Sequence, residues 1–180
     1  MAHVFVETER LKLREWCHED RAAFAAMNAD ADVMRYFPHV QSREESDASV
    51  DRCIWRIQQD GFGFWATEFK KNSQFIGFIG IQRAAEYLPF APAIEIGWRL
   101  DKSFWGEGLA PEGAKACLAF AFDDLDVKEV IAMTTKHNAP SRRVMDKIAM
   151  TYDPHGDFDH PMVPEASPIR PHVLYRVRPS

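Results

Sequence analysis

Trp105-Gly106-Glu107-Gly108-Leu109-Ala110-Pro111-Glu112 is the segment from which the fold of this chain can be inferred. Its two glycines stand just ahead of a proline, and an amphipathic run follows. Glycine accepts positive φ and lets the backbone approach a ligand closely, and proline is favoured at the first position of a helix. Exposed N–H groups at a helix N-terminus bind anions. We therefore expect this segment to hold a phosphate-bearing molecule where a helix begins.

Three other interpretations of this segment were compared with its sequence: a plain tight turn, the Rossmann fingerprint and the P-loop. A Gly-x-Gly pair before a helix is also a common tight turn, and the residues alone leave that alternative open. The Rossmann fingerprint needs a third glycine or an alanine at the position of Pro111. A P-loop needs Gly-Lys-Ser/Thr, but Gly113 is followed by Ala114 and Lys115. Neither of these two phosphate-binding motifs is therefore present.

Strand and helix patterns lie on both sides of the glycine turn. In the segment 93–100, Ile94 and Ile96 share one strand face, while Glu95, Gly97 and Arg99 share the other. The proline-rich segment 152–171 is expected to be irregular. Strands are expected over residues 8–16, 64–70, 75–82, 93–100, 129–134 and 172–177; helices are expected over 18–30, from Ser42 to the glycines at 61 and 63, over 110–123, and after Asn138.

Length, charge and cysteine content restrict the class of protein. The 180 residues are enough for one domain with a real core, and the net charge of −5 argues against a nucleic-acid partner. Cys17, Cys53 and Cys117 are far apart and form no CxxC motif, which indicates reduced thiols rather than a disulfide frame or a zinc site. The N-terminal residues lack a signal-peptide pattern, and no apolar run approaches the roughly 20 residues that span a bilayer. We expect a cytoplasmic protein with no membrane partner.

The order of strand, glycine turn, helix, strand, Asn-x-x-Ser and short helix resembles that of the GNAT family of N-acetyltransferases. Thr8-Glu9-Arg10-Leu11-Lys12-Leu13-Arg14 resembles the first strand of the branch that acetylates the N-termini of ribosomal proteins. The family's Gln/Arg-x-x-Gly-x-Gly/Ala pattern departs here at Trp105 and fits at Gly108 and Ala110. The resemblance continues through the segments 95–98 (Glu-Ile-Gly-Trp), 105–110, 138–147 and 157–161 (Asp-Phe-Asp-His-Pro), the last being similar to a signature of a subset of that branch.

The resemblance implies both a fold and an activity. The implied fold is a single α+β domain over residues 1–180, with a mixed, mostly antiparallel sheet of six to seven strands flanked by helices. Strands 93–100 and 129–134 would form a central parallel pair that splays apart and admits the cofactor. The implied reaction moves an acetyl group from acetyl-CoA to a primary amine in a ternary complex, without a covalent enzyme intermediate and without a metal.

The resemblance also implies which residues hold acetyl-CoA. The amides around Glu107 to Ala110 would bind the pyrophosphate, Asn138 would bind the pantetheine arm, and a backbone N–H near Ile96 or Gly97 would stabilise the oxyanion. Arginine side chains suit phosphate, although a solvated helix face is an equal alternative for two arginines in the last helix. The expected cofactor-binding residues are Ile96, Gly97, Glu107, Gly108, Leu109, Ala110, Asn138, Ser141, Arg142 and Arg143.

Two residues are candidates for proton transfer. An amine attacks only as the free base, so a base must remove a proton, and Glu95 is the best candidate, acting through a water; a solvated or salt-bridged strand glutamate is the alternative. Many family members have, at the position of Met145 in this chain, a tyrosine that acts as the general acid. Ser141 is the expected replacement as in the ribosomal-protein branch, although it can also be a helix cap, and transfer without a dedicated acid stays open.

The acceptor side is less defined by the sequence. Trp16, Tyr36, Phe37 and Trp65 are candidates for lining the acceptor cleft, with packing in the core as the alternative. Asp157, Asp159 and His160 lie close together, but the absence of a second cluster argues against a metal site. The resemblance instead implies that the segment with Asp157 and His160 shapes the acceptor pocket.

The identity of the acceptor stays open. A protein N-terminus and a small-molecule amine both fit, and the acidic chain suits a cationic acceptor. A homodimer is possible, because dimers are common among members of the family. Two alternative functions also remain at this stage: a non-catalytic acyl-CoA-binding or regulatory protein, and an acyltransferase directed at oxygen or sulfur.

Overall fold

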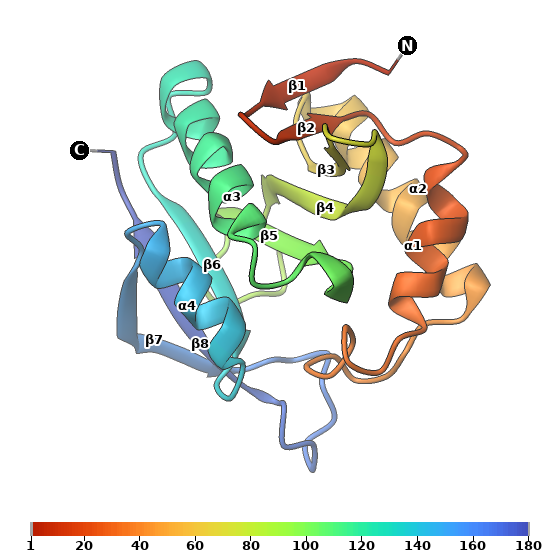
Figure 1. The fold of residues 1–180 in the computed structure, drawn as a ribbon. Helices are drawn as coiled ribbons and strands as arrows, with labels where there is room; N and C mark the ends of the chain where they lie inside the picture. Colours follow the sequence, from red (N-terminus) through yellow and green to blue (C-terminus); the bar gives the residue numbers. More distant parts are fainter. Residues whose placement is uncertain (1, 180) are drawn as a thin grey trace.

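The computed structural model describes residues 2–179 and forms an eight-stranded sheet with helices on both faces (Figure 1). The strands are β1 (Val4–Glu7), β2 (Leu11–Arg14), β3 (Phe64–Phe69), β4 (Gln74–Arg83), β5 (Ile94–Leu100), β6 (Val130–Thr135), β7 (Thr151–Asp159) and β8 (Pro171–Val177). The helices are α1 (Asp20–Asn28), α2 (Arg43–Asp60), α3 (Leu109–Ala119) and α4 (Ala139–Lys147), with a 3-10 turn at Lys102–Phe104 and a π-helical turn at Phe120–Asp124. The expected α+β class is confirmed.

The two central strands of the sheet are parallel and soon diverge. The strand order is β1-β2-β3-β4-β5-β6-β8-β7, and β5 with β6 is the parallel pair among the described strands. These two strands pair only at Ile94 with Val130 and at Glu95 with Ile131. Beyond Glu95 the β6-facing edge of β5 has no partner among the described strands. The splayed parallel pair expected from the sequence is thus present.

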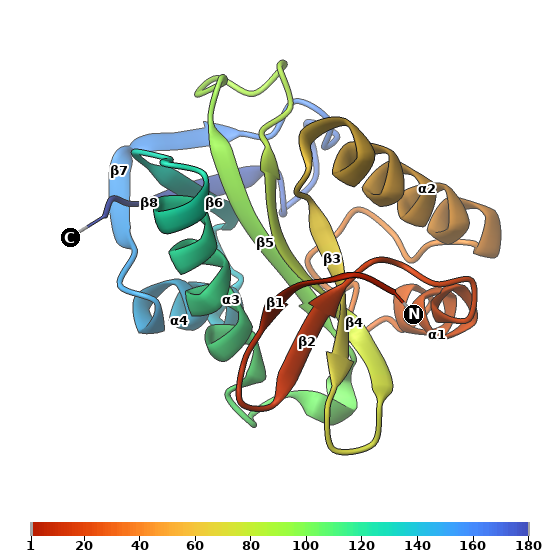
Figure 2. The same ribbon diagram turned by 90° about the horizontal axis from the view of Figure 1, so that it is seen from above.

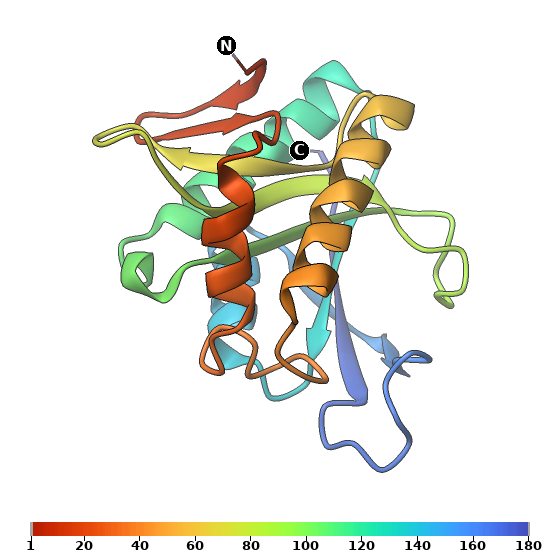
Figure 3. The ribbon, with the colours of Figure 1, turned by 90° about the vertical axis from the view of Figure 1, so that its right-hand side faces the viewer.

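The helices form one layer on each face of the sheet (Figure 2). α3 packs on β4 and β5 and α4 packs on β6, whereas α1 and α2 contact β4 and β3 (Figures 2 and 3). α2 begins at the expected capping box, in which Ser42 and Glu45 bond each other's backbone N–H, and it ends at Gly61, whose φ is 79°. Within residues 2–179, no helix is both long and apolar enough to cross a membrane.

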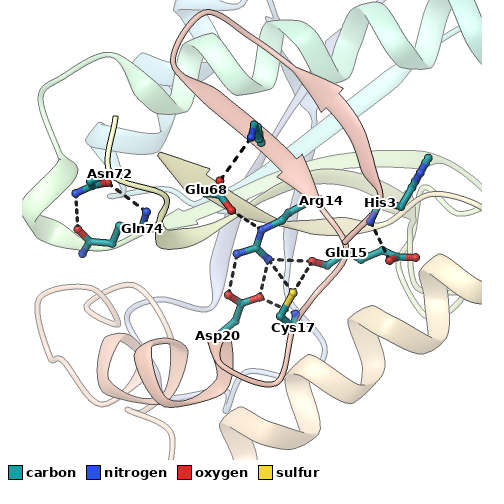
Figure 4. Close-up of polar contacts among 9 residues, drawn as sticks. His3, Arg14, Glu15, Cys17, Asp20, Glu68, Asn72 and Gln74 are labelled. Carbon is teal, nitrogen blue, oxygen red and sulfur yellow. Dashed lines mark hydrogen bonds and ion pairs between the residues drawn. The ribbon is translucent and has the colours of Figure 1, made fainter. Parts of the chain in front are cut away.

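A buried arginine joins three elements at one end of the sheet (Figure 4). Arg14, on β2, donates from Nη1 and Nη2 to the Asp20 carboxylate at 2.8 and 3.0 Å, and from Nε to Glu68 on β3 at 2.8 Å. Asp20 is the first residue of α1, and its carboxylate also accepts from the backbone N–H of Cys17. This bidentate, charge-assisted arrangement fixes the first residue of α1 relative to β2 and β3.

The sheet has eight strands rather than the expected six or seven, because both edge strands were missed. The segment 152–171 was expected to be irregular, but β7 pairs with β8 from Thr151 to Asp159. The register shifts between Asp153 and Phe158, and this irregularity accommodates Pro154 and Gly156. Proline is tolerated at a sheet edge, where its missing N–H is not needed for a second partner. β1 is a four-residue edge strand with a similar register shift.

Candidate active site

A cavity of about 660 Å³ lies where β5 and β6 separate. It extends from the turn before α3 and the start of α4 to the loop between α1 and α2. It therefore connects the two helical layers through the opening in the sheet. Its lining includes Asp32, Arg35, Tyr36, Phe37, Phe64, Phe78, Glu95, Ile96, Gly97, Arg99, Gly106, Gly108, Leu109, Ala110, Asn138, Ser141, Arg143, Met145 and Lys147.

Four residues of the glycine turn line this cavity: Gly106, Gly108, Leu109 and Ala110, whereas Glu107, expected with them, is not part of the lining. Gly106 and Gly108 have φ of 80° and 76°, the left-handed region that glycine adopts without strain. Gly108 is the N-cap of α3 and no side chain caps that helix. Within residues 2–179, the amides from Gly106 to Ala110 have no hydrogen-bond acceptor. α3 begins at Leu109, so Pro111 is its third residue rather than its first. The turn has the properties of an anion-binding helix N-terminus.

An ion pair that the sequence analysis did not identify holds this turn against β2. Arg10 donates from Nε to Glu112 at 2.6 Å and from Nη1 to the carbonyl of Glu107 at 2.9 Å. Glu112 also accepts from the Thr8 hydroxyl and from the backbone N–H of Arg10. Partial burial raises the pKa of Glu112, but these hydrogen bonds outweigh it and leave that pKa below its ordinary value. Glu112 thus stays ionised and anchors the first turn of α3.

Asn138 and Ser141 form one hydrogen-bonded unit at the start of α4. Asn138 is the N-cap: its Oδ1 accepts from the backbone N–H of Ser141, and its Nδ2 donates to the hydroxyls of Thr134 at 2.9 Å and Ser141 at 3.0 Å. The cap is therefore Asn138 rather than Ser141. The Ser141 hydroxyl accepts from Asn138, and its proton has no acceptor among the described residues. It can donate that proton to a group bound in the cavity.

Glu95 is a buried carboxylate at the point where β5 and β6 diverge. Its side chain is on the wall of the cavity, although only 8% of the residue is exposed, and it accepts a hydrogen bond from Gln82. Burial raises the pKa of Glu95, while the Gln82 bond and the charge of Arg56 oppose that effect. A carboxylate whose pKa moves toward neutrality is better suited to accept a proton as a general base.

The basic residues of α4 point in different directions. Arg143 and Lys147 both line the cavity, one helical turn apart. Arg142 was expected to bind the cofactor together with Arg143. It instead donates to the Tyr175 hydroxyl and to the carbonyl of Lys136, both at 3.1 Å. Successive helical residues are rotated by about 100°, so Arg142 lies outside the lining of the cavity. Lys147 was missed, although its spacing of four residues from Arg143 would have indicated it.

The expected aromatic residues divide between the cleft and the core. Tyr36 and Phe37 line the cavity from the α1–α2 loop. Trp65 is fully buried against Phe5, and Trp16 packs on Phe24 while its Nε1 donates to the carbonyl of Phe64. The proposal that both tryptophans line the acceptor cleft is therefore corrected, because their side chains lie in the hydrophobic core. Phe64 and Phe78 were missed as lining residues.

Asp157 and His160 also lie away from this cavity. Asp157 accepts from the Tyr152 hydroxyl at 2.7 Å and lines a separate cavity of about 300 Å³. The His160 ring packs on His172, with the ring centroids 4.9 Å apart. β7 is the last strand of the sheet, beyond β8, so its side chains do not reach the opening between β5 and β6. Within residues 2–179, no group of three or more His, Cys, Asp or Glu side chains is arranged to hold a metal ion.

The sequence and the fold were each compared with those of known proteins, and the results agree with each other. Residues 10–151 match the family described as "Acetyltransferase (GNAT) domain". The chain is 30% identical over 151 residues to the uncharacterized protein YkkB of Bacillus subtilis, covering 81% of this chain and 84% of that protein. Its fold is similar to that of a GNAT-family acetyltransferase from Bacillus anthracis, with a TM-score of 0.79 at 24% identity, covering 99% of this chain and 98% of that one. RimL, a ribosomal L7/L12 alpha-N-protein acetyltransferase solved in complex with coenzyme A, has a TM-score of 0.77 at 18% identity, with 98% of each chain covered.

Proposed function

The chain belongs to the acetyltransferase (GNAT) family, and on this basis we propose that it moves an acetyl group from acetyl-CoA directly to the primary amine of a bound acceptor. One observation carries the proposal. A single cavity contains an anion-binding turn, a buried carboxylate and a hydroxyl with a proton to donate. The proposal treats residues 1–180 as one N-acetyltransferase domain. The acceptor is a protein N-terminus, as the name of RimL states for that enzyme, or a small-molecule amine.

The chain offers separate groups for the separate parts of acetyl-CoA. The unpaired amides from Gly106 to Ala110 fit a pyrophosphate. Arg143 and Lys147 provide positive charge for a further phosphate. The open edge of β5 after Glu95 provides backbone groups for the pantetheine arm. Bound in this way, acetyl-CoA supplies an activated thioester.

The chain then offers a residue or backbone group for each step of the transfer. Glu95 takes a proton from the acceptor ammonium, through a water, and frees the nitrogen lone pair. As the N–C bond forms, a backbone N–H near Ile96 or Gly97 stabilises the negative charge on the carbonyl oxygen. The C–S bond breaks, and the Ser141 hydroxyl donates its proton to the leaving thiolate. The serine oxygen then takes up, through water, the second proton that the nitrogen loses, so that the amide product is neutral. Met145, at the position of the family's usual tyrosine acid, has no proton to give.

The first test is calorimetric titration with acetyl-CoA and with dephospho-CoA. We expect acetyl-CoA to bind, and dephospho-CoA to bind more weakly because it lacks the 3′-phosphate. Arg143→Gln should weaken acetyl-CoA binding by about 3- to 20-fold, the range for a charge-assisted hydrogen bond at a partly exposed site. Arg142→Gln is the matched control, because Arg142 is adjacent in sequence but outside the cavity.

Three outcomes of this test lead to different conclusions. If neither ligand binds, the interpretation of the glycine turn and the proposed activity both fail. If acetyl-CoA and dephospho-CoA bind equally, Arg143 and Lys147 do not contact the 3′-phosphate. Binding without turnover over a broad panel of amines, alcohols and thiols would make the protein a non-catalytic acyl-CoA-binding protein.

A further inference from the structure

Arg99 lies in the part of the cavity beside the α1–α2 loop, away from the groups assigned to acetyl-CoA on the α3–α4 side, and has no role in the steps above. It is on β5, on the same strand face as Glu95 and Gly97. Its Cα is about 13 Å along the strand from that of Glu95, at about 3.3 Å per residue. Its side chain lines the cavity beside the α1–α2 loop. The position suits recognition of a part of the acceptor remote from the reacting amine.

The Arg99 guanidinium is held in a fixed position. It lies over the ring of Phe37 at 4.2 Å and within 5.5 Å of the ring of Phe78. Its Nη1 donates to Oδ1 of Asn28 at 2.8 Å. Asn28 in turn donates from Nδ2 to the Ser46 hydroxyl at 2.9 Å, and this bond fixes which end of the amide faces Arg99. Both Asn28 and Ser46 are fully buried, so the support is rigid.

The charge of this guanidinium is not balanced within the chain. No carboxylate of residues 2–179 lies within 4.0 Å of Arg99. Asp30 and Asp32, in the loop after α1, both pair with Lys102, at 2.6 and 3.3 Å. The Nε of Arg99 is buried without a hydrogen-bond partner, and burial lowers the pKa of this side chain to about 10. A partly buried cation without a counter-ion is unfavourable, and an anionic ligand would relieve that cost.

We propose that Arg99 binds a carboxylate of the acceptor, so that the substrate is an amine that also carries a carboxylate. This inference rests on the proposed function, because it assigns the acceptor of the same cavity. Nη1 already donates to Asn28 and Nε is buried, so Nη2 is the guanidinium nitrogen that remains to pair with a carboxylate from the cavity.

The surface between the two charged ends predicts the shape of this acceptor. The ring of Phe64 lies over Gly97, where an added Cβ would be 2.8 Å from Cζ of that ring. An apolar surface therefore separates Glu95 from Arg99. The acceptor has its amine near Glu95, an apolar spacer over Phe64, and its carboxylate at Arg99. This spacing favours a short peptide or an ω-amino acid over a free α-amino acid. An acceptor that carries a carboxylate also differs from the cationic acceptor that the net charge of the chain suggested.

The test compares pairs of acceptors that differ only in the anionic group. Dipeptides and ω-amino acids of increasing length are assayed beside their C-terminal amides, with acetyl-CoA saturating. For the best spacer, the acid should exceed the amide in kcat/KM by about 10- to 100-fold, as expected for a charge-assisted pair in a partly buried site. Arg99→Gln should abolish this ratio, mainly through KM of the acid. Arg52→Gln, an exposed arginine on α2 outside the cavity, should leave the ratio unchanged.

A second variant keeps the proposal testable if Arg99→Gln fails to fold. Asn28→Asp is nearly isosteric and gives Arg99 a carboxylate partner inside the chain. It should reduce the preference for the acid by about tenfold, and it should leave acetyl-CoA affinity unchanged. A purely structural role for Arg99 would instead change kcat/KM of the acid and the amide by the same factor.

The failure of this proposal can be distinguished from the failure of the proposed function. If the amide and the acid are acetylated equally well by the wild-type protein, the carboxylate subsite is wrong and the acetyltransferase activity stands. If no amine in the panel is acetylated, calorimetry of the acid and its amide with the coenzyme A-loaded protein decides: equal or no binding overturns the subsite, and tighter binding of the acid that depends on Arg99 supports it. An aminoalkyl phosphate that binds more tightly than the acid of equal length would overturn the assignment to a carboxylate.

Discussion

At the scale of single residues, Glu95 has opposite effects on stability and on activity. Burial raises the pKa of Glu95, the proposed base, which lies at the opening between β5 and β6. Glu95→Gln keeps an oxygen that can accept from Gln82 but removes the base. We expect kcat to fall by about 10²- to 10⁴-fold, with acetyl-CoA affinity unchanged in calorimetry. A kcat within about twofold of wild type would remove Glu95 from the mechanism.

The same burial predicts a pH-dependent effect on stability. Because the folded pKa of Glu95 lies above its unfolded value, the folded state binds the extra proton between those two values. Its contribution to stability is present at low pH and is lost as the pH rises through the folded pKa. Glu95→Gln should therefore raise Tm relative to wild type at pH 7.5, and the difference should vanish near pH 4 in thermal melts. A lower Tm for the variant at pH 7.5 would contradict this reasoning.

Ser141 and Asn138 make different contributions, and two variants separate them. Asn138 caps α4, so Asn138→Ala should lower the free energy of unfolding by about 1–2 kcal/mol, measured by urea denaturation. Ser141→Ala keeps the cap and should cost less stability, but should lower kcat by about 10- to 100-fold, near the low end for positioned proton transfer because a thiolate leaves readily. If Ser141→Ala lowers stability as much as Asn138→Ala and leaves kcat unchanged, Ser141 is a structural residue.

At the scale of elements, the anion-binding turn depends on a strand far away in sequence. Arg10→Gln removes the donor to the Glu107 carbonyl and leaves Glu112 as an unpaired negative charge in the first turn of α3. Both changes disfavour a bound phosphate, and acetyl-CoA should bind about two- to tenfold more weakly in calorimetry. The double variant Arg10→Gln/Glu112→Gln should recover part of that loss. Additive losses would show that the pair does not act through the turn.

The elements predicted correctly were those with a strong local signal. The capping box at Ser42, the alternation over 93–100 and the glycine turn each encode a boundary or a face within a few residues. β7 was missed because Pro154 and Gly156 disfavour a strand locally, and only pairing with β8 at the sheet edge overrides that preference. Its existence is a property of the sheet as a whole.

The residues of the candidate site divide in the same way, into those whose position is set by the local sequence and those whose position depends on the whole sheet. Glu95, Asn138 and three predicted turn residues, Gly108, Leu109 and Ala110, line the cavity, because their own strand end, cap and helix start set their positions, and their roles stay predictions. Placement of Trp16, Asp157 and the other acceptor candidates depends on which strands flank the opening, and strand order is not encoded in any local pattern. Arg99 shares a strand face with Glu95, but its missing counter-ion is visible only in three dimensions.

At the scale of the whole molecule, the opening in the sheet lets elements of both helical layers line one cavity. The α3–α4 layer provides the unpaired amides and Ser141, while the α1–α2 layer provides the loop around Arg99. In an unbroken sheet these groups would be separated by its thickness. The divergence of β5 from β6 after Glu95 brings the two proposed ligand sites into a single cavity. Acetyl-CoA and the acceptor are therefore expected to contact different layers.

Hydrogen exchange measured by mass spectrometry tests this division between the layers. Acetyl-CoA at about 100 times its Kd should raise Tm by about 5–10 °C through mass action. It should slow exchange in segments 105–112 and 138–142, which contain the turn and the start of α4. A carboxylate-bearing acceptor, added to the coenzyme A complex, should slow exchange in segment 28–37, and its amide should not, because only the carboxylate pairs with Arg99. Protection of segment 28–37 by acetyl-CoA alone would show that the two ligands do not divide between the layers, and that the α1–α2 loop serves the coenzyme instead.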